Sequence, residues 1–171
     1  MILIIEKIGL SLEVEDELLD KLLGMGKTYY PKEFGGFLIG YYSENHKHLH
    51  ITDTILPKNY RASKYSFERS TQGIENELTE FYTGNPRKIY IGEWHTHPDS
   101  SPIPSATDIS AINTIINNKE ASIDNPVLLI IGYSKITVDF GFYVWFEDKL
   151  YKYEKSLTKS YILGNSFIPV Y

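Results

Sequence analysis

The sequence predicts an α/β (α+β) fold, in which a mixed central β-sheet is flanked by helices. Segments with strand-like patterns outnumber segments with helical spacing, and the two kinds are interspersed along the chain. No internal repeat and no low-complexity linker interrupts them. A chain of 171 residues is long enough to bury a hydrophobic core and short enough to form one domain. We therefore expect residues 1–171 to form a single domain.

The first third of the chain predicts strands around one amphipathic helix. Apolar residues over 2–5 and alternation over 10–12 indicate two short strands. Leucines at helical spacing predict a helix over residues 14–25, and Gly24 and Gly26 are expected to end it. The next two strands, 34–42 and 48–55, flank a polar turn and predict a hairpin.

Residues 57–70 are polar and aromatic and show no clear period. Residues 71–82 place apolar side chains at helical spacing, and this helix is expected to end at Gly84. A third helix is expected over 105–118, with four isoleucines facing inward, Ile109, Ile112, Ile115 and Ile116. The remaining strands are expected at residues 87–95, 127–132, 136–146 and 150–153. The final residues, 161–171, stay unassigned.

Composition excludes several classes of function. A formal net charge of −5 and the lack of a Lys/Arg-rich run argue against nucleic acid as a primary partner. No stretch reaches the ~18 apolar residues of a membrane span. The apolar start is broken by Glu6 and Lys7, unlike a signal peptide, which predicts a cytoplasmic protein. Cysteine is absent, so any zinc site must use histidine and carboxylate ligands.

The most informative stretch runs from residue 92 to residue 108. His95 and His97 stand two apart at the end of an expected strand, which puts both imidazoles on one face, about 6.5 Å apart along the strand. Such a pair can converge on one zinc ion at ~2.0–2.1 Å. Asp108, at the start of the next helix, supplies a third ligand and leaves a fourth position for water. Two structural interpretations stay open: a purely structural His pair, and a capping box formed by Ser105 and Asp108.

The complete pattern resembles the JAMM motif of the JAB/MPN metallopeptidases. That motif reads His-x-His-Pro, six residues, then Ser-x-x-Asp, and this chain fills each position from His95 to Asp108. The family's upstream glutamate stands in Glu-x-x-Gly-x-Leu-x-Gly, which is similar to residues 33–40 here. The resemblance covers residues 25–135 and implies the JAB/MPN core, similar to the cytidine deaminases.

The resemblance also implies a set of residue roles. One zinc ion per chain is expected on His95, His97 and Asp108, with Glu33 as general base and Ser105 as the donor to an oxyanion. Glu93 is a competing candidate for the base, because it shares the strand face of the two histidines, although a supporting role beside the metal suits it better. Trp94 points to the opposite face and is expected in the core.

The run from Tyr90 to Pro98 and the sequence Phe67-Glu-Arg69 are most similar to small bacterial members. Those include deconjugating peptidases of CBASS antiviral operons and proteins encoded beside E1-like and E2-like enzymes. The resemblance implies an isopeptidase that acts on the C-terminus of a ubiquitin-like or E2-conjugated protein. Alternatives are maturation of a sulfur-carrier precursor, cleavage of a cell-wall or phage peptide, and a non-catalytic MPN scaffold. A zinc deaminase is excluded, because its Pro-Cys-x-x-Cys motif needs cysteine.

A second group of histidines lies elsewhere. His46, His48 and His50 alternate along one strand face, but the sequence places no carboxylate beside them. We therefore expect a solvated strand edge there rather than a metal site.

Overall fold

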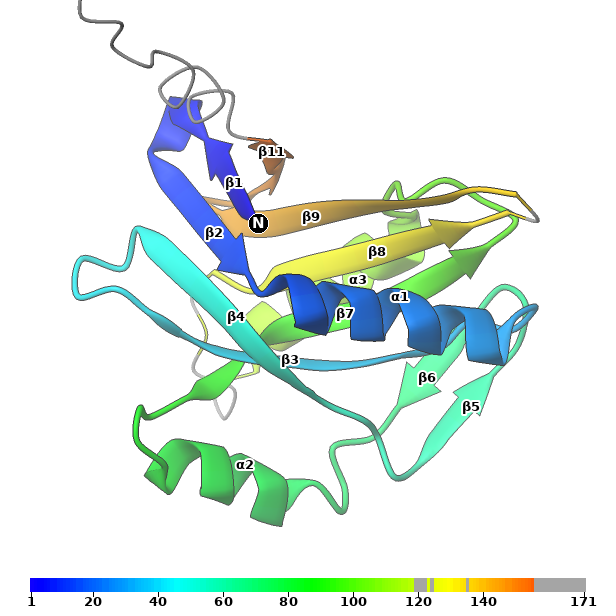
Figure 1. Cartoon of the computed structure of the whole chain (residues 1–171), viewed down its shortest axis with the longest axis horizontal. Helices are drawn as coiled ribbons and strands as arrows, with labels where there is room; N and C mark the ends of the chain where they lie inside the picture. Colours follow the sequence, from blue (N-terminus) through cyan, green and yellow to red (C-terminus); the bar gives the residue numbers. More distant parts are fainter. Residues whose placement is uncertain (119–122, 124, 135, 156–171) are drawn as a thin grey trace, which may run out of the picture.

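The computed structural model describes residues 1–118, 123, 125–134 and 136–155. Its centre is one mixed sheet with the strand order β10-β9-β8-β7-β3-β4-β2-β1-β11 (Figure 1). Neighbouring strands are antiparallel except in two pairs, β2 with β4 and β7 with β8, which are parallel. A separate hairpin, β5 with β6, lies outside this sheet. The predicted mixed sheet flanked by helices is confirmed.

The elements follow the expected order. The strands are β1 (Ile2–Ile5), β2 (Leu10–Val14), β3 (Gly35–Tyr42), β4 (His48–Ile55), β5 (Tyr60–Ala62), β6 (Phe67–Arg69), β7 (Ile89–Pro98), β8 (Val127–Tyr133), β9 (Val138–Phe146), β10 (Lys149–Lys152) and β11 (Glu154–Lys155). The helices are α1 (Asp16–Tyr29), α2 (Glu75–Thr83) and α3 (Ala106–Asn117), with a short 3₁₀ helix at Glu6–Ile8.

The two faces of the sheet carry different helices, as Figure 1 shows with α1 in front of the sheet and α3 behind it. Successive side chains of a strand point to opposite faces. In β3, Leu38 belongs to the large core cluster that includes Leu18 and Leu22 of α1. Its neighbours Phe37 and Ile39 join a second cluster under α2. A third cluster joins Ile112 of α3 to alternate residues of β8. Therefore α1 covers one face, and α2 and α3 cover the other.

Three sequence-based expectations are corrected. Helix α1 does not end at Gly24 or Gly26 but continues to Tyr29. Gly26 is buried against the ring of Tyr133, where a Cβ would clash, so tertiary packing favours glycine inside this helix. The Tyr29 ring stacks on Phe34 with centroids 3.5 Å apart, which supports the extra turn.

The other two corrections concern short or exposed features. Residues 57–70, which show no period, contain the β5–β6 hairpin. Their strands are only three residues long, too short for an alternation to be visible. In α3, Ile112 is buried but Ile109 is exposed. The helix therefore buries a narrower apolar stripe than its sequence predicts. The unassigned segment 161–171 lies outside the described residues.

Candidate active site

His95 and His97 lie near the C-terminal end of β7, on the face that α3 covers. Their side chains are only 9% and 11% exposed, and their Nε2 atoms stand 3.0 Å apart. The residue between them, Thr96, faces the other way and is buried. Trp94 is also fully buried, and its indole Nε1 donates a hydrogen bond to Thr54 Oγ1 at 2.8 Å, so its expected core position is confirmed. Strand alternation therefore aims both imidazoles into one space.

Asp108 approaches this pair from the first turn of α3. Its Oδ1 lies 3.0 Å from His95 Nε2, and its Oδ2 lies 3.5 Å from His97 Nε2. The capping box at the start of α3 is present: Ser105 N and Oγ both donate to Asp108 Oδ2, at 2.6 and 2.7 Å, and Asp108 N donates to Ser105 Oγ. The carboxylate is thus held by the helix cap while it faces the histidines.

The loop after β7 orients His97. Its Nδ1 lies 3.1 Å from the carbonyl oxygen of Ser101, a contact in which Nδ1–H donates. A neutral imidazole that donates from Nδ1 presents the lone pair of Nε2 to the shared space. This contact could not be predicted from the sequence, because every residue carries a backbone carbonyl whatever its type.

Glu33 stands just before β3 and is anchored through its neighbours. Phe34 N donates to Thr96 Oγ1 at 2.9 Å, and Thr96 N donates to the Phe34 carbonyl at 2.8 Å. Glu33 N donates to the carbonyl of Ser63. Gly35 pairs with His95, and a Cβ there would clash with the Trp94 carbonyl and His95. This close approach of β3 to β7 brings Glu33 to the cavity that the histidines line.

The charges of this group are strongly coupled. Burial raises the pKa of Glu33 to about 7, and nearby Asp108 adds to this effect while His97 opposes it. Burial lowers the pKa of His95. For His97, hydrogen bonds to Asp108 and Ser101 outweigh burial and raise the pKa. For Asp108, burial is outweighed by the hydrogen bonds from both histidines, which hold its pKa well below the usual value.

Glu93 lies on the same face, as expected, but its carboxylate is already engaged. It is 8% exposed and forms an ion pair with Arg69 of β6. Burial lowers the pKa of Arg69, and its Nε has no hydrogen-bond partner among the described residues. In the sequence, Phe67-Glu-Arg69 pointed only to a similarity with small bacterial members of the family, and Arg69 was given no role of its own. A single arginine in a segment without hydrophobic periodicity gives no sign that its side chain will be buried.

These side chains line one cavity of about 150 Å³ between β6, β7 and α3. It brings together all five sequence-predicted site residues and two charged residues beside them, Glu33, Arg69, Glu93, His95, His97, Ser105 and Asp108. The hairpin β5–β6 supplies one wall, through residues 65–69.

The three candidate ligands fit a zinc ion by chemistry and spacing. Their donor atoms all lie within 4.8 Å of one another. Two N/O ligands at ~2.1 Å from one tetrahedral ion are ~3.4 Å apart. His95 Nε2 lies 3.0 Å from both His97 Nε2 and Asp108 Oδ1, and His97 Nε2 lies 3.5 Å from the other carboxylate oxygen, Asp108 Oδ2. These distances are near that edge. Imidazole nitrogens with one carboxylate are also a ligand set typical of catalytic zinc.

Comparison with known proteins identifies the family of this chain. Residues 15–142 match the family described as prokaryotic homologs of the JAB domain. The chain belongs to this family. Its matched region includes all five candidate site residues, the Glu33 segment as well as the stretch from His95 to Asp108.

Relatives in this family carry names of peptidases. A protein named CD-NTase/cGAS isopeptidase from Enterobacter hormaechei is 36% identical over 102 residues, 58% of this chain and 55% of that protein. The chain thus spans about half the length of this relative. A probable metalloprotease, y4qB, from Sinorhizobium fredii is 27% identical over 69% of this chain and 73% of its own. An Escherichia coli protein, also named CD-NTase/cGAS isopeptidase, is 29% identical over 73% of this chain and 78% of its own.

A solved structure shares the fold. The solution structure of protein DSY2949 from Desulfitobacterium hafniense matches with a TM-score of 0.59 at 16% identity, over 82% of this chain and 88% of that one. At this identity the likeness concerns the fold alone. Within the described residues, no helix is long and apolar enough to cross a membrane.

Proposed function

We propose that this chain is a zinc-dependent isopeptidase of the JAMM type. One observation carries the proposal: three ligand atoms converge in a cavity that also contains Glu33, a carboxyl group whose pKa is raised to about 7. His95, His97 and Asp108 would hold the ion, one per chain. When bound, zinc supplies Lewis-acid chemistry, acidifying water and polarising a carbonyl group.

Glu33 is the proposed general base. A base with a pKa near the working pH combines a useful ionised fraction with the ability to return the proton. Glu33 would take a proton from the attacking water and deliver it to the nitrogen of the leaving amine. Its half-buried carboxyl is not tied into any ion pair that the structure records, in contrast to Glu93, which is paired with Arg69. This difference favours Glu33 over Glu93.

Ser105 is the proposed donor to the oxyanion of the tetrahedral intermediate. Its hydroxyl has one hydrogen, and that hydrogen is donated to Asp108 in the structure. The catalytic role therefore requires the hydroxyl to turn from Asp108 toward the substrate carbonyl, while Ser105 N keeps its own bond to the carboxylate. Arg69 and Glu93 lie on the cavity wall, and their ion pair would hold both charged groups in place beside the scissile bond.

The proposed substrate is the C-terminus of a ubiquitin-like or E2-conjugated protein, joined to its target by an amide or isopeptide bond. The names of the relatives in Enterobacter and Escherichia support a conjugate that contains a CD-NTase as the substrate. We further propose that the gene lies in a CBASS-like antiviral operon, beside E1-like and E2-like partners. A sulfur-carrier precursor remains the alternative substrate. The metal ligands determine the type of reaction, but they do not determine which substrate the surrounding pocket accepts.

The test uses the conjugate of a CD-NTase with the E2-like protein encoded beside this chain, with the products mapped by mass spectrometry. We expect cleavage after the last residue of the conjugated tail. A chelator and Glu33→Gln should each abolish it, and His46→Asn, a remote surface change, should not. An intact conjugate alongside cleavage of a Gly-Gly sulfur-carrier precursor would replace the proposal with the maturation alternative.

A further inference from the structure

The second histidine group does not lie at a strand edge, because β4 is paired with β3 on one side and with β2 on the other. A carboxylate also stands beside it. Strand β2 pairs in parallel with β4, and in their register Glu13 lies opposite His50 and Ser11 lies opposite His48. All four side chains point to the same, half-exposed face of the sheet, since their neighbours in both strands are buried. The expectation that no carboxylate accompanies these histidines is therefore wrong for His48 and His50.

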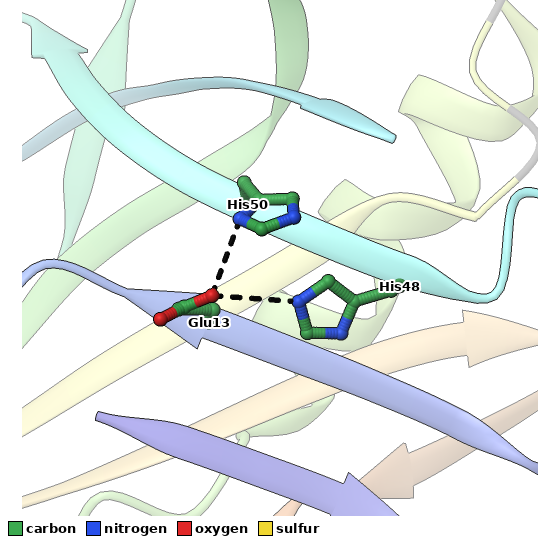
Figure 2. A group of neighbouring side chains, drawn as sticks. All are labelled: Glu13, His48 and His50. Atoms are coloured by element: carbon green, nitrogen blue, oxygen red, sulfur yellow. Dashed lines mark ion pairs between the residues drawn. The ribbon is translucent and has the colours of Figure 1, made fainter. Parts of the chain in front are cut away.

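Figure 2 shows Glu13, His48 and His50 converging from two strands on one point. The same oxygen, Glu13 Oε2, lies 3.3 Å from His50 Nδ1 and 3.6 Å from His48 Nε2. The two imidazole rings are nearly perpendicular, with centroids 4.4 Å apart. One donor atom from each residue lies within 4.8 Å of the others, as in the group of His95, His97 and Asp108.

Neighbouring side chains fix both rings. Ser11 Oγ lies 2.6 Å from His48 Nδ1, so this nitrogen is occupied and Nε2 is the one that faces Glu13. The ring of Tyr41 stacks on His50 with centroids 4.6 Å apart and an angle of 16° between the planes. Histidines that bind a metal through one ring nitrogen usually form a hydrogen bond with the other, which fixes the orientation of the ring.

The contacts of Glu13 with the two histidines are longer than strong charged hydrogen bonds. A charge-assisted N–H···O hydrogen bond is ~2.7–2.9 Å long, and both contacts to Glu13 exceed it. Ligands of one tetrahedral ion are ~3.4 Å apart, which lies between the two observed values. The distances from Glu13 Oε2 to the two histidine nitrogens therefore match two edges of a coordination tetrahedron, and all three donor atoms lie within 4.8 Å of one another.

We propose that Glu13, His48 and His50 form a second metal site, which binds a divalent transition-metal ion such as Zn²⁺. Two imidazoles and one carboxylate favour such an ion over Mg²⁺ or Ca²⁺, which prefer all-oxygen ligands. The ion would add a further link between β2 and β4, which are already joined by the hydrogen bonds of a parallel pair and by the contact of Ser11 with His48. Because the side chains are 28% to 43% exposed, water completes the coordination and the ion exchanges more readily than one held in a cavity.

Isothermal titration of ZnCl₂ into the metal-free, untagged full chain tests this proposal. We expect two equivalents in the unaltered chain, and loss of the weaker one in His50→Gln and in Glu13→Gln. Ser11→Ala should weaken that equivalent about 10-fold, the usual effect of removing a partner behind a ligand. His46→Asn is the matched control and should keep both equivalents, because His46 lies on the same hairpin but outside the cluster.

Binding must also be separated from the first cluster. In a His95→Gln/His97→Gln background we expect one remaining equivalent, which His50→Gln then removes. A second measurement needs no substitution: the ring resonances of His48 and His50 should shift on adding the second equivalent of Zn²⁺, while those of His46 stay unchanged. A single equivalent that His95→Gln/His97→Gln removes, or a second equivalent that survives His50→Gln with unmoved His48 and His50 resonances, overturns the proposal. A single equivalent that survives His95→Gln/His97→Gln and is lost in His50→Gln supports it and counts against the first cluster instead.

Discussion

Two clusters of two histidines and one carboxylate stand on the same sheet, and they differ mainly in their surroundings. In both, the histidines are two residues apart on a strand, and the carboxylate comes from another element. The side chains of His95, His97 and Asp108 are 9% to 12% exposed, whereas those of Glu13, His48 and His50 are 28% to 43% exposed. Similar ligand sets thus lie in environments of different polarity.

The comparison teaches that ligand geometry alone does not make an active site. Around the first cluster a cavity holds Glu33, whose burial raises its pKa, and the Arg69–Glu93 ion pair. These are the conditions under which electrostatic effects are large, because water is largely excluded. The second cluster lies open on a strand pair, where solvent screens its charges. We therefore assign chemistry to the first and only ion binding to the second.

Removing the first pair of ligands should have the largest effect. His95→Ala/His97→Ala is expected to lose the tightly bound zinc and at least about 10³-fold in turnover, since a catalytic ion contributes several kcal/mol to the transition state. Elemental analysis after dialysis and the conjugate-cleavage assay measure the two effects. Stoichiometric tight zinc that survives both substitutions would remove the distinction between the clusters.

The base should have the next largest effect. Glu33→Gln is expected to keep both zinc equivalents but to lower kcat by about 10²–10⁴-fold, because only proton transfer is lost. Glu93→Gln is the matched variant, on the same cavity but paired with Arg69. If Glu93→Gln is inactive and Glu33→Gln fully active, their roles must be exchanged.

Ser105 contributes both to the helix cap and to the proposed oxyanion contact, and two substitutions separate these. Ser105→Ala should lower kcat by about 10²-fold through loss of one donor, and lower stability by about 1 kcal/mol through loss of the cap. Ser105→Gly, which costs a helix cap only about a few tenths of a kcal/mol and has no side-chain donor, should recover most of the melting temperature but not kcat. Recovery of both would show that the serine is only structural.

The smallest effect concerns stability in the absence of metal. The pKa of Glu33 is raised from 4.5 to about 7 in the folded chain, so the unfolded chain releases this proton first. Stability contributed by the protonated group is therefore complete below pH 4.5 and is lost as pH rises toward 7. Glu33→Gln should stabilise the metal-free protein at pH 8 by about 1 kcal/mol, a value reduced for solvent screening of a half-exposed group.

Thermal unfolding of the metal-free protein at pH 4 and pH 8 measures that difference. We expect the two melting temperatures to coincide at pH 4 and to separate at pH 8, with the variant higher. A variant that is less stable at pH 8 would mean that the carboxylate is well solvated, and that its cavity resembles the open surroundings of Glu13.

The sequence predicted those features that depend on neighbours along the chain. The alternation around Trp94 correctly placed both histidines on one face, because strand geometry is local. The grouping of these histidines with Asp108, Ser105 and Glu33 was implied by the resemblance to the JAMM motif, since local patterns left structural interpretations open. Their role in binding zinc stays a prediction. The length of α1 was mispredicted, since the contact of Gly26 with Tyr133 joins residues distant in sequence.

The second cluster and Arg69 were missed for the same physical reason. Glu13 and His50 meet only because β2 and β4 are parallel neighbours, and strand order is set by the packing of the whole sheet. Arg69 reaches the cavity through a hairpin of three-residue strands. Long-range pairing of this kind leaves no periodic signal in either segment.

The capping box at the start of α3 has a consequence for how Asp108 is oriented. Ser105 holds the Asp108 carboxylate through its backbone N–H and its hydroxyl, and α3 thereby satisfies part of its own first turn. Fixing a side chain in one orientation costs conformational entropy. The helix cap would therefore meet part of that cost for the proposed zinc ligand, so the ion alone would not have to order the carboxylate.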